Sequence, residues 1–343
     1  MKVLLIRREN IGDLILTTPL ISMLARDHQV DLLVNSYNQS VLDNNPHVNK
    51  IHLYTKLHHS KNAQAKIGII VKRLKTLLTI RREKYDVAII VKEEWDKRPL
   101  HWAKASGARR VIAIGEDGPC CITDKLPRMT GKQHLVERLH TLAEPLGYHE
   151  APGPLELYLS EQEKQWALQY ANINPSLPVY GLQISARKVK QRWPTEHFIE
   201  LAQRLAAREH CQLLLFWAPG AEDNPHHPGD DGKAMQILAG CHGLPIIPFK
   251  TTTIRELMAA MSLCCQVLTS DGGALHIAAG VQRPVVALFG NSDAFCWGPW
   301  KVPSRVIEAE GRDVNNISTD RVFEAFTDLR AEVTGLKNAL THC

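Results

Sequence analysis

Hydrophobic and polar residues follow each other along this chain in a regular order, with short apolar runs separated by longer stretches of mixed character. The runs are rich in Val, Ile and Leu and end at turn residues, which is typical of strands covered on both faces of a parallel sheet. The strands expected in this way are 2–7, 30–34, 51–54, 85–91, 110–114, 179–184, 212–216, 245–247, 266–269 and 285–289.

The stretches between these runs carry apolar residues at intervals of three and four, the spacing that predicts amphipathic helices. Pro19 lies inside the first of them, and it either kinks that helix or occupies the first turn of one that begins near Thr18. The expected helices are 14–25, 67–80, 131–146, 161–170, 196–208, 232–238, 254–261, 274–279 and 319–336. Strands that alternate with helices predict an α/β fold with parallel, doubly wound sheets.

The tripeptide Pro152-Gly153-Pro154 interrupts this pattern, and a similar order of strands and helices starts again after it. A chain of 343 residues is long enough for two domains of ordinary size. We therefore expect two Rossmann-like α/β domains, residues 1–155 and 156–319, facing a central cleft, and a final helix within residues 320–343.

Composition narrows the class of protein. Apolar residues make up 44% of the chain and charged residues 22%, as in a globular protein in solution. No run approaches the roughly 20 apolar residues that span a bilayer, and the apolar run at residues 3–6 is too short for a signal peptide, so we expect a cytoplasmic protein. The eight cysteines lack metal-site spacing and no Asp-x-Asp pair occurs, so we expect neither a metal nor a cofactor.

Positive charge is concentrated in one segment. Residues 50–84 hold ten Lys and Arg and one acid, a net charge of +9, which leaves 5 − 9 = −4 for the rest of the chain. Such a local excess favours one specific anionic partner, and we expect no nucleic acid among the partners. Lys72, Arg73 and Lys75 lie in the helical part of this segment and are the expected contacts. The alternative is an ordinary solvated helix face.

The stretch 269–290 carries the first candidate chemistry. A buried strand ends in the turn Ser270-Asp271-Gly272-Gly273, a short helix follows, and residues 285–289 form the next strand. Backbone N–H groups at a glycine turn that opens a helix make a seat for a phosphate, and His276 lies close enough in sequence to donate to the same anion. The alternative is an ordinary tight turn with a half-buried histidine.

The other candidates also follow strands. Asp13 comes after the first strand, where it faces a ligand or, on the more common alternative, caps the next helix. Residues 185–194, SARKVKQRWP, place four cations within six positions: Arg187, Lys188, Lys190 and Arg192. Glu222 lies in the loop after the strand 212–216, and a carboxylate can accept two hydrogen bonds; the family resemblance described below implies that it accepts them from ribose hydroxyls. The alternative for the cations is a solvated basic loop.

These segments together resemble glycosyltransferase family 9, the heptosyltransferases of the lipopolysaccharide inner core. SDGGALHIAAG followed by RPVVALFG is similar to the family's donor-site signature, and IGDLILTTPL is similar to the segment that holds its catalytic base. A weaker similarity lies in residues 131–138, where the alternative is a plain helix start. Two positions depart from the family pattern: Gln191 stands where a lysine is usual, and Gly272 where Ser or Thr is usual.

The resemblance implies a GT-B fold whose last helix packs back onto the first domain. It implies inverting, metal-independent transfer of heptose from ADP-heptose to the lipopolysaccharide core on lipid A, by a monomer at the inner face of the cytoplasmic membrane. Asp13 is then the catalytic base. The implied donor-binding residues are Arg187, Lys188, Lys190, Glu222, Asp271, Gly272, Gly273 and His276, and the acceptor-binding residues are Arg7, Asn10, Lys72, Arg73 and Lys75.

Three other functions compete with this interpretation. A dinucleotide-dependent oxidoreductase is disfavoured because no Gly-x-Gly occurs anywhere in the chain, so its phosphate-binding fingerprint is absent. A GT-B transferase or epimerase acting on a different nucleotide sugar stays open, because Gln191 and Gly272 depart from the family pattern. A non-catalytic nucleotide-sugar binding protein is disfavoured by the presence of Asp13, but the same two departures leave it open.

Overall fold

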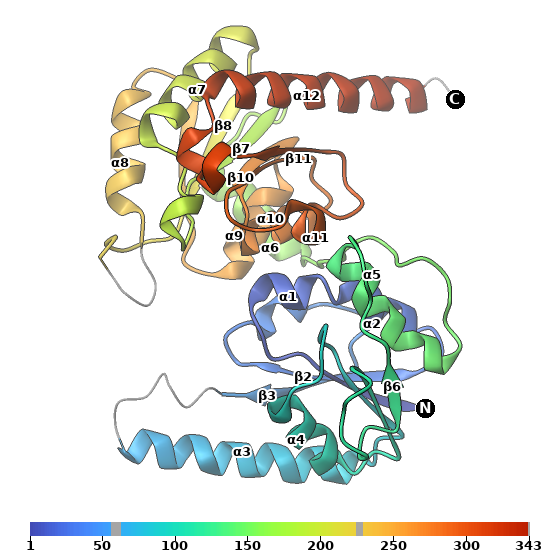
Figure 1. The fold of residues 1–343 in the computed structure, drawn as a ribbon. Coiled ribbons are helices and arrows are strands. Elements are labelled where there is room, and N and C mark those ends of the chain that lie inside the picture. Colours follow the sequence, from blue (N-terminus) through green and yellow to red (C-terminus); the bar gives the residue numbers. More distant parts are fainter. Residues whose placement is uncertain (56–62, 224–228, 342–343) are drawn as a thin grey trace. The chain divides into compact units, whose positions relative to one another are not determined.

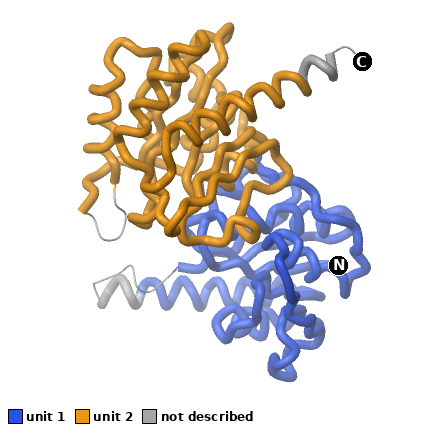
Figure 2. Tube along the Cα trace, turned by 45° about the horizontal axis from the view of Figure 1, so that its top comes forward, with its two compact units in different colours: residues 1–158 blue, residues 159–343 orange. Residues whose placement is uncertain are grey.

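The computed structural model describes residues 1–55, 63–223 and 229–341 of the chain (Figure 1). The chain divides into two compact units, Met1–Tyr158 and Leu159–Cys343 (Figure 2). The division falls shortly after the Pro-Gly-Pro linker, close to the expected boundary at residue 155.

The first unit is built on a parallel sheet of six strands in the order β3-β2-β1-β4-β5-β6. The central strand β1 is buried, and Val3 lies opposite Val30 of β2 on one side and Val87 of β4 on the other. The strands are β1 Lys2–Ile6, β2 Gln29–Asn35, β3 Lys50–Tyr54, β4 Val87–Ile90, β5 Arg110–Ile114 and β6 Asp124–Leu126.

The helices of the first unit are α1 Ile11–Ile15, α2 Thr18–Leu24, α3 Ala63–Glu83, α4 Lys97–Ser106 and α5 Leu135–His140, with short 3₁₀ helices η1 Gln39–Leu42 and η3 Thr141–Leu146. The single helix expected at 14–25 is two helices, because Pro19 occupies the first turn of α2, where its missing N–H costs nothing. The helix expected at 131–146 begins only at Leu135 and turns to 3₁₀ geometry before Pro145. α4 is bounded by an Asp96 cap and by Gly107 at a φ of +69°.

The second unit repeats the plan of the first. Its six parallel strands follow the order β12-β11-β10-β7-β8-β9, so the first strand of each unit lies between the second and the fourth strands of that unit. The strands are β7 Val179–Gln183, β8 Gln212–Trp217, β9 Ile246–Lys250, β10 Gln266–Ser270, β11 Val285–Phe289 and β12 Ser304–Glu308. The expected α/β class with doubly wound parallel sheets is confirmed in both units.

Helices flank this second sheet as well. They are α6 Glu161–Ala171, α7 Thr195–Arg208, α8 Asp231–Gly240, α9 Ile254–Ser262, α10 Gly273–Gly280, α11 Ala294–Trp297 and α12 Thr319–Thr341, with 3₁₀ helices η4 Val189–Gln191, η5 Glu310–Arg312 and η6 Val314–Asn316. α6 and α9 each begin with a capping box, formed by Ser160 with Glu163 and by Thr253 with Glu256. The long helix α12 packs on α7, β11 and β12 of its own unit. Its expected return to the first domain stays a prediction.

Each unit has a hydrophobic core of its own. The core of the first unit gathers side chains of β1, β4 and β5 with Trp102 and Ile80 from the helices, and that of the second gathers β7, β8 and α7 with Phe326 of α12. Among the residues in the described ranges, no helix combines the length and the apolar character needed to cross a membrane.

Candidate active site

The first candidate site lies where the strand order of the first sheet reverses. β1 and β4 are neighbours although about 80 residues separate them, and their carboxyl ends lead into the loops 7–10 and 91–96. In doubly wound sheets this switch point is the usual place for a ligand. Arg7, Asn10 and Asp13, which sequence analysis selected, are all found here.

Arg7 and Asp13 form an ion pair whose arginine is buried. Nη2 of Arg7 lies 3.0 Å from Oδ1 of Asp13, and the Arg7 side chain is 2% exposed. The same guanidinium donates to the Asp13 carbonyl over 3.1 Å and to the Val91 carbonyl of the neighbouring loop over 2.6 Å. Arg7 therefore fixes the position of the Asp13 carboxylate and connects the two loops of the switch point.

Asp13 is not the helix cap that the alternative interpretation expected. Asn10 is the N-cap of α1, and Asp13 is the third helical residue, whose Oδ2 accepts from the Asn10 N–H at 2.9 Å and from the Asn10 amide at 3.1 Å. This return bond is half of a capping box. It leaves the Asp13 side chain 13% exposed, so its carboxylate still reaches the surface.

Sequence analysis missed two cations at this edge of the sheet. Arg8 stacks on the ring of Tyr54 with its guanidinium carbon 3.9 Å from the ring centre, and only 9% of Arg8 is exposed. Lys92 follows β4 and pairs with Asp96 at 2.7 Å. Arg8 and Lys92 could have been selected from the sequence, because each is a polar residue that comes shortly after a buried strand.

The three expected acceptor contacts on α3 differ in their surroundings. The guanidinium carbon of Arg73 lies 4.5 Å from the centre of the Tyr54 ring, and Arg73 donates to the Tyr54 hydroxyl at 2.9 Å and to the Thr55 carbonyl at 2.7 Å. Lys72 and Lys75 are exposed. Lys56 and Lys61, which belong to the same basic segment, lie outside the described residues.

The second candidate site lies at the corresponding place in the second sheet, where β7 and β10 are neighbours. Asp271 follows β10, and its Oδ2 accepts from the side-chain amide of Gln191 at 2.6 Å and from the hydroxyl of Ser292. Gln191 belongs to η4 after β7 and is 5% exposed. The residue that departs from the family pattern thus joins the two loops of this switch point.

The glycine turn has the geometry expected of it. Gly272 precedes α10 and has a φ of +154°, which L side chains rarely adopt, although a Cβ added there would meet no atom within 4 Å. The first N–H groups of a helix have no partner inside it, so the turn presents donors to an anion. His276, on the fourth residue of α10, is 3% exposed.

The four cations of the loop 185–194 separate into two kinds. Arg187, Lys188 and Lys190 are exposed. Arg192 is partly buried, donates to the Ala186 carbonyl at 3.0 Å, and brings Nη1 to 3.7 Å from Oε1 of Glu222. The cation beside Glu222 is therefore Arg192, one of the four cations singled out in the sequence but absent from the list of implied donor-binding residues.

A pocket of about 810 Å³ opens beside this pair, lined by the start of α7, the loop after β8 and the start of α8. Lys233 of α8 is among its lining residues although it is only 8% exposed, and its Nζ donates to the Trp193 carbonyl at 2.5 Å. Burial lowers the pKa of Lys233 to about 8. Burial also raises the pKa of Asp230, one turn earlier. Nothing in the sequence distinguishes Lys233 from a surface lysine.

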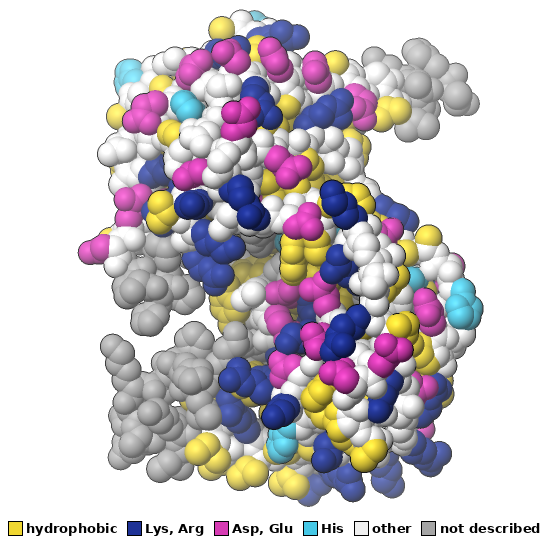
Figure 3. Space-filling view, viewed as in Figure 1, with side chains coloured by type: hydrophobic (Ala, Val, Ile, Leu, Met, Phe, Trp, Pro, Cys, Tyr) yellow, Lys and Arg dark blue, Asp and Glu magenta, His cyan; other side chains and the backbone are white. Residues whose placement is uncertain are grey.

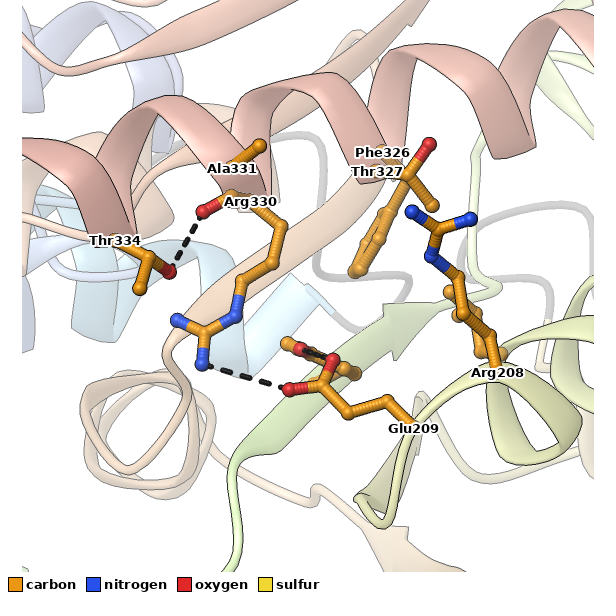
Figure 4. A pocket seen from close by; sticks show the side chains of 9 residues that line it. Arg208, Glu209, Phe326, Thr327, Arg330, Ala331 and Thr334 are labelled. Atoms are coloured by element: carbon orange, nitrogen blue, oxygen red, sulfur yellow. Dashed lines mark hydrogen bonds and ion pairs between the residues drawn. The ribbon is translucent and has the colours of Figure 1, made fainter.

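A smaller pocket of about 340 Å³ lies at the amino-terminal end of β7, whereas the switch point lies at the carboxyl ends of the strands (Figure 4). Glu209 projects into it, where Arg330 of α12 approaches its carboxylate to 3.7 Å and the Tyr180 hydroxyl donates to it. These contacts fasten α12 to the sheet, and they lie away from the switch point.

Residues 131–138 form a helix start, as the plain alternative expected. His134 caps α5 by accepting from the Val136 N–H at 3.2 Å, and Glu137 returns to the His134 N–H at 2.9 Å. Both polar side chains thus accept hydrogen bonds from backbone N–H groups at the amino-terminal end of α5.

The chain is similar in sequence to known proteins of one family. Residues 73–324 match the sequence profile of glycosyltransferase family 9 (heptosyltransferase). Lipopolysaccharide heptosyltransferase 3 of Escherichia coli K12 is 26% identical over 298 residues, covering 84% of this chain and 82% of that protein. Lipopolysaccharide heptosyltransferase 2 of the same strain is 27% identical over 325 residues, covering 90% and 88%.

Solved structures share the fold. A family 9 glycosyltransferase from Veillonella parvula superposes with a TM-score of 0.82 at 19% identity, over 96% of this chain and 97% of the other. The E. coli ADP-heptose lipopolysaccharide heptosyltransferase II gives a TM-score of 0.74 at 24% identity, over 97% and 99%. The chain therefore has the GT-B fold that the resemblance implied.

Proposed function

The chain belongs to glycosyltransferase family 9, the heptosyltransferase family, and from this premise we propose that it transfers heptose from ADP-heptose to the inner core of lipopolysaccharide. Two relatives that cover more than four-fifths of the chain are named lipopolysaccharide heptosyltransferases, which supports both the sugar and the acceptor. The donor nucleotide is supported by the name of the E. coli structure with a TM-score of 0.74.

In the proposed reaction Asp13 is the general base. Its carboxylate takes the proton of an acceptor hydroxyl while that oxygen attacks the anomeric carbon of the heptose. The bond from this carbon to the diphosphate oxygen breaks, ADP leaves, and the anomeric configuration is inverted. Arg7 is a positioning residue in this scheme, because it holds the carboxylate at 3.0 Å and is itself almost fully buried.

The charge that develops on the departing diphosphate requires donors in place before the reaction. The N–H groups of Gly272 and Gly273 and the ring of His276 are proposed for this role, with Asp271 kept in place by Gln191. Glu222 is proposed to accept from the ribose hydroxyls. Of the loop cations, Arg192 is proposed to take over the contact of the missing lysine, since its Nη1 lies 3.7 Å from Oε1 of Glu222. Arg187, Lys188 and Lys190 are proposed as further contacts of the diphosphate.

The remaining parts of the proposal concern metal dependence, oligomeric state and location in the cell. We propose that no divalent metal takes part, that the protein acts as a monomer, and that it works at the cytoplasmic surface of the inner membrane, where lipid A carries the core. The positive charge of residues 50–84 supports an anionic acceptor surface.

The observation that carries the proposal is the placement of the two motifs. Asp13 in the first sheet and Asp271 in the second both lie at a switch point, and in each a buried polar side chain, Arg7 or Gln191, joins the two loops. Ligand sites of doubly wound sheets occur at these places.

Product analysis tests the proposal. The purified protein is incubated with ADP-heptose and a set of defined, truncated lipopolysaccharide cores, and products are followed by mass spectrometry and by NMR of the new anomeric centre. We expect one added heptose, with inverted configuration, on one core only. UDP-glucose is the control donor. Transfer from UDP-glucose but not from ADP-heptose would replace this function by that of another nucleotide-sugar transferase, and donor binding without any transfer by that of a binding protein.

A further inference from the structure

Helix α3 of the first unit carries an apolar stripe on its solvent side. Four large side chains in the helix are far more exposed than core residues: Ile70 (48%), Val71 (45%), Leu74 (54%) and Leu78 (58%). Residues three or four positions apart are neighbours on a helix, and the steps 70–74, 71–74 and 74–78 all have this spacing. The four side chains therefore form one continuous stripe.

The stripe is not the face by which α3 joins its unit. That attachment uses Ile80, which is fully buried, and Arg73 and Thr76, which bond to the carbonyls of Thr55 and Leu53 at the end of β3. The helix is thus fastened on one side, while an adjacent side exposes leucine and isoleucine to solvent. Contiguous exposed apolar surface of this kind marks an interaction site.

Cations border the stripe. Lys75 lies four residues after Val71 and three before Leu78, and Arg82 lies four residues after Leu78, so both are neighbours of the stripe, and both are exposed. The one acid of the helix, Glu83, is engaged by Lys2 at 3.0 Å and by Lys50. Figure 3 shows hydrophobic and basic side chains side by side along the lower edge of the molecule, where α3 runs in Figure 1.

We propose that this stripe, Ile70, Val71, Leu74 and Leu78 with Lys75 and Arg82 beside it, docks α3 on an anionic lipid bilayer, with the apolar side chains among the acyl chains and the cations at the headgroups. A helix lying in the plane of a membrane surface has this combination of an apolar face and flanking Lys and Arg. The inference rests on the proposed action at the membrane and adds the surface that makes the contact.

Charge decides between a bilayer and a second copy of this chain. If two copies joined through the stripe, Lys75 and Arg82 of one copy would lie near Lys75 and Arg82 of the other. The acid of α3, Glu83, could not pair with them because Lys2 and Lys50 already engage it. Anionic lipid headgroups instead complement both cations, and each basic residue near such a surface strengthens binding.

Vesicle binding without substrates tests the inference. The full-length protein is sedimented with vesicles of phosphatidylcholine containing phosphatidylglycerol, at low salt and at about 1 M salt, where the Debye length is only about 3 Å. We expect the protein to bind the vesicles at low salt. At high salt we expect weaker but measurable binding, because salt screens the contacts of the cations and leaves those of the apolar side chains. In Leu74→Gln/Leu78→Gln the partition coefficient should fall about tenfold or more, tenfold being about 1.4 kcal/mol. Glutamine keeps helix propensity close to that of leucine.

Leu336→Gln is the matched control, since Leu336 is a leucine on helix α12 with 52% exposure. Leu74→Trp is the converse variant, and it should bind more tightly because tryptophan favours membrane interfaces. Wild-type binding by Leu74→Gln/Leu78→Gln, or an equal loss in Leu336→Gln, would overturn the inference. So would a dimer in sedimentation velocity that the double variant abolishes.

Transfer to a delipidated core oligosaccharide separates this inference from the proposed function. The double variant should transfer heptose to this soluble acceptor at the wild-type rate while failing to bind vesicles. If neither the wild type nor the variants transfer heptose, the proposed function fails. The vesicle experiment still decides whether the stripe on α3 binds a membrane.

Discussion

The guanidinium of Arg7 lies 3.0 Å from the carboxylate of Asp13 and 2.6 Å from the carbonyl of Val91, so a residue at the end of β1 positions the carboxylate against the loop after β4. A general base has to be placed within hydrogen-bond reach of its proton, and a rigid neighbour achieves this at little entropic cost. The pair is therefore the first target for mutation.

Asp13→Asn should lower turnover by roughly 10²- to 10⁴-fold, because an amide cannot accept the proton, while ADP affinity stays within about twofold. Initial rates with a soluble core acceptor and calorimetry with ADP give the two readouts. Glu9→Gln is the control, since Glu9 lies 3.8 Å from the same arginine and has no proposed role. Near-normal turnover in Asp13→Asn would leave Asp13 as a structural residue of α1.

Glu222→Ala and His276→Ala should each weaken ADP binding by roughly tenfold or more, because each removes a hydrogen bond to a hydroxyl or a phosphate. Calorimetry with ADP measures the effect, and His210→Ala, which replaces an exposed histidine of the same unit, controls for histidine loss as such. If both variants bind ADP like the wild type, the donor site lies elsewhere.

Lys233 should make stability depend on pH above neutrality. Its pKa is lowered from 10.5 to about 8 in the folded protein, so between these values the unfolded chain binds more protons than the native one. The free energy of unfolding should then rise with pH across this window, by up to about 1.4 kcal/mol per unit. Lys233→Met should lose this rise. Urea unfolding from pH 7.5 to 10 gives the difference curve, and parallel curves for both proteins would contradict a lowered pKa.

The acceptor KM should rise with salt while ADP affinity changes less, because attraction between surface charges is screened over roughly 8 Å at physiological ionic strength. Lys72→Gln/Lys75→Gln should raise the acceptor KM and flatten its salt dependence. Arg73 is left unchanged here because it bonds to Thr55, so its loss would disturb the attachment of α3. A double variant that kept both properties would make these lysines part of a solvated face.

Activity should survive an excess of chelator. The N–H groups of the glycine turn and the nearby cations are proposed to neutralise the diphosphate in place of a metal. Steady-state rates with and without EDTA are the measurement. A loss that only magnesium or manganese reverses would show that a metal is required.

The sequence predicted the buried strands well and missed one edge strand of each sheet. β1, β5, β7 and β11 are short buried runs of Val, Ile and Leu, which carry a clear signal. β6 and β12 escaped notice because all of their residues except Ile307 are partly buried or exposed, so burial imposes no apolar pattern on them. α4 was missed because its ten residues mix four charged or histidine side chains with Pro99.

In the candidate site, too, some residues could be selected from the sequence and others could not. Asp13 and Asp271 were selected because the order of residues around them resembles the family motifs, and their roles stay predictions. The bonds from Arg7 to Val91 and from Gln191 to Asp271 could not be predicted, because they join residues 84 and 80 positions apart that only the strand order brings together. Lys233 illustrates the limit, because its burial depends on the packing of α8 and not on its neighbours in sequence.

The shared strand order of the two sheets bears on how this enzyme can be redesigned. Each half has its own sheet and its own core, and the proposed base and the proposed nucleotide seat belong to different halves. Specificity for the sugar nucleotide and specificity for the acceptor are then separable properties, each inherited with one half. Chimaeras joined at residues 158 and 159 with the halves of related enzymes should exchange one specificity while leaving the other intact.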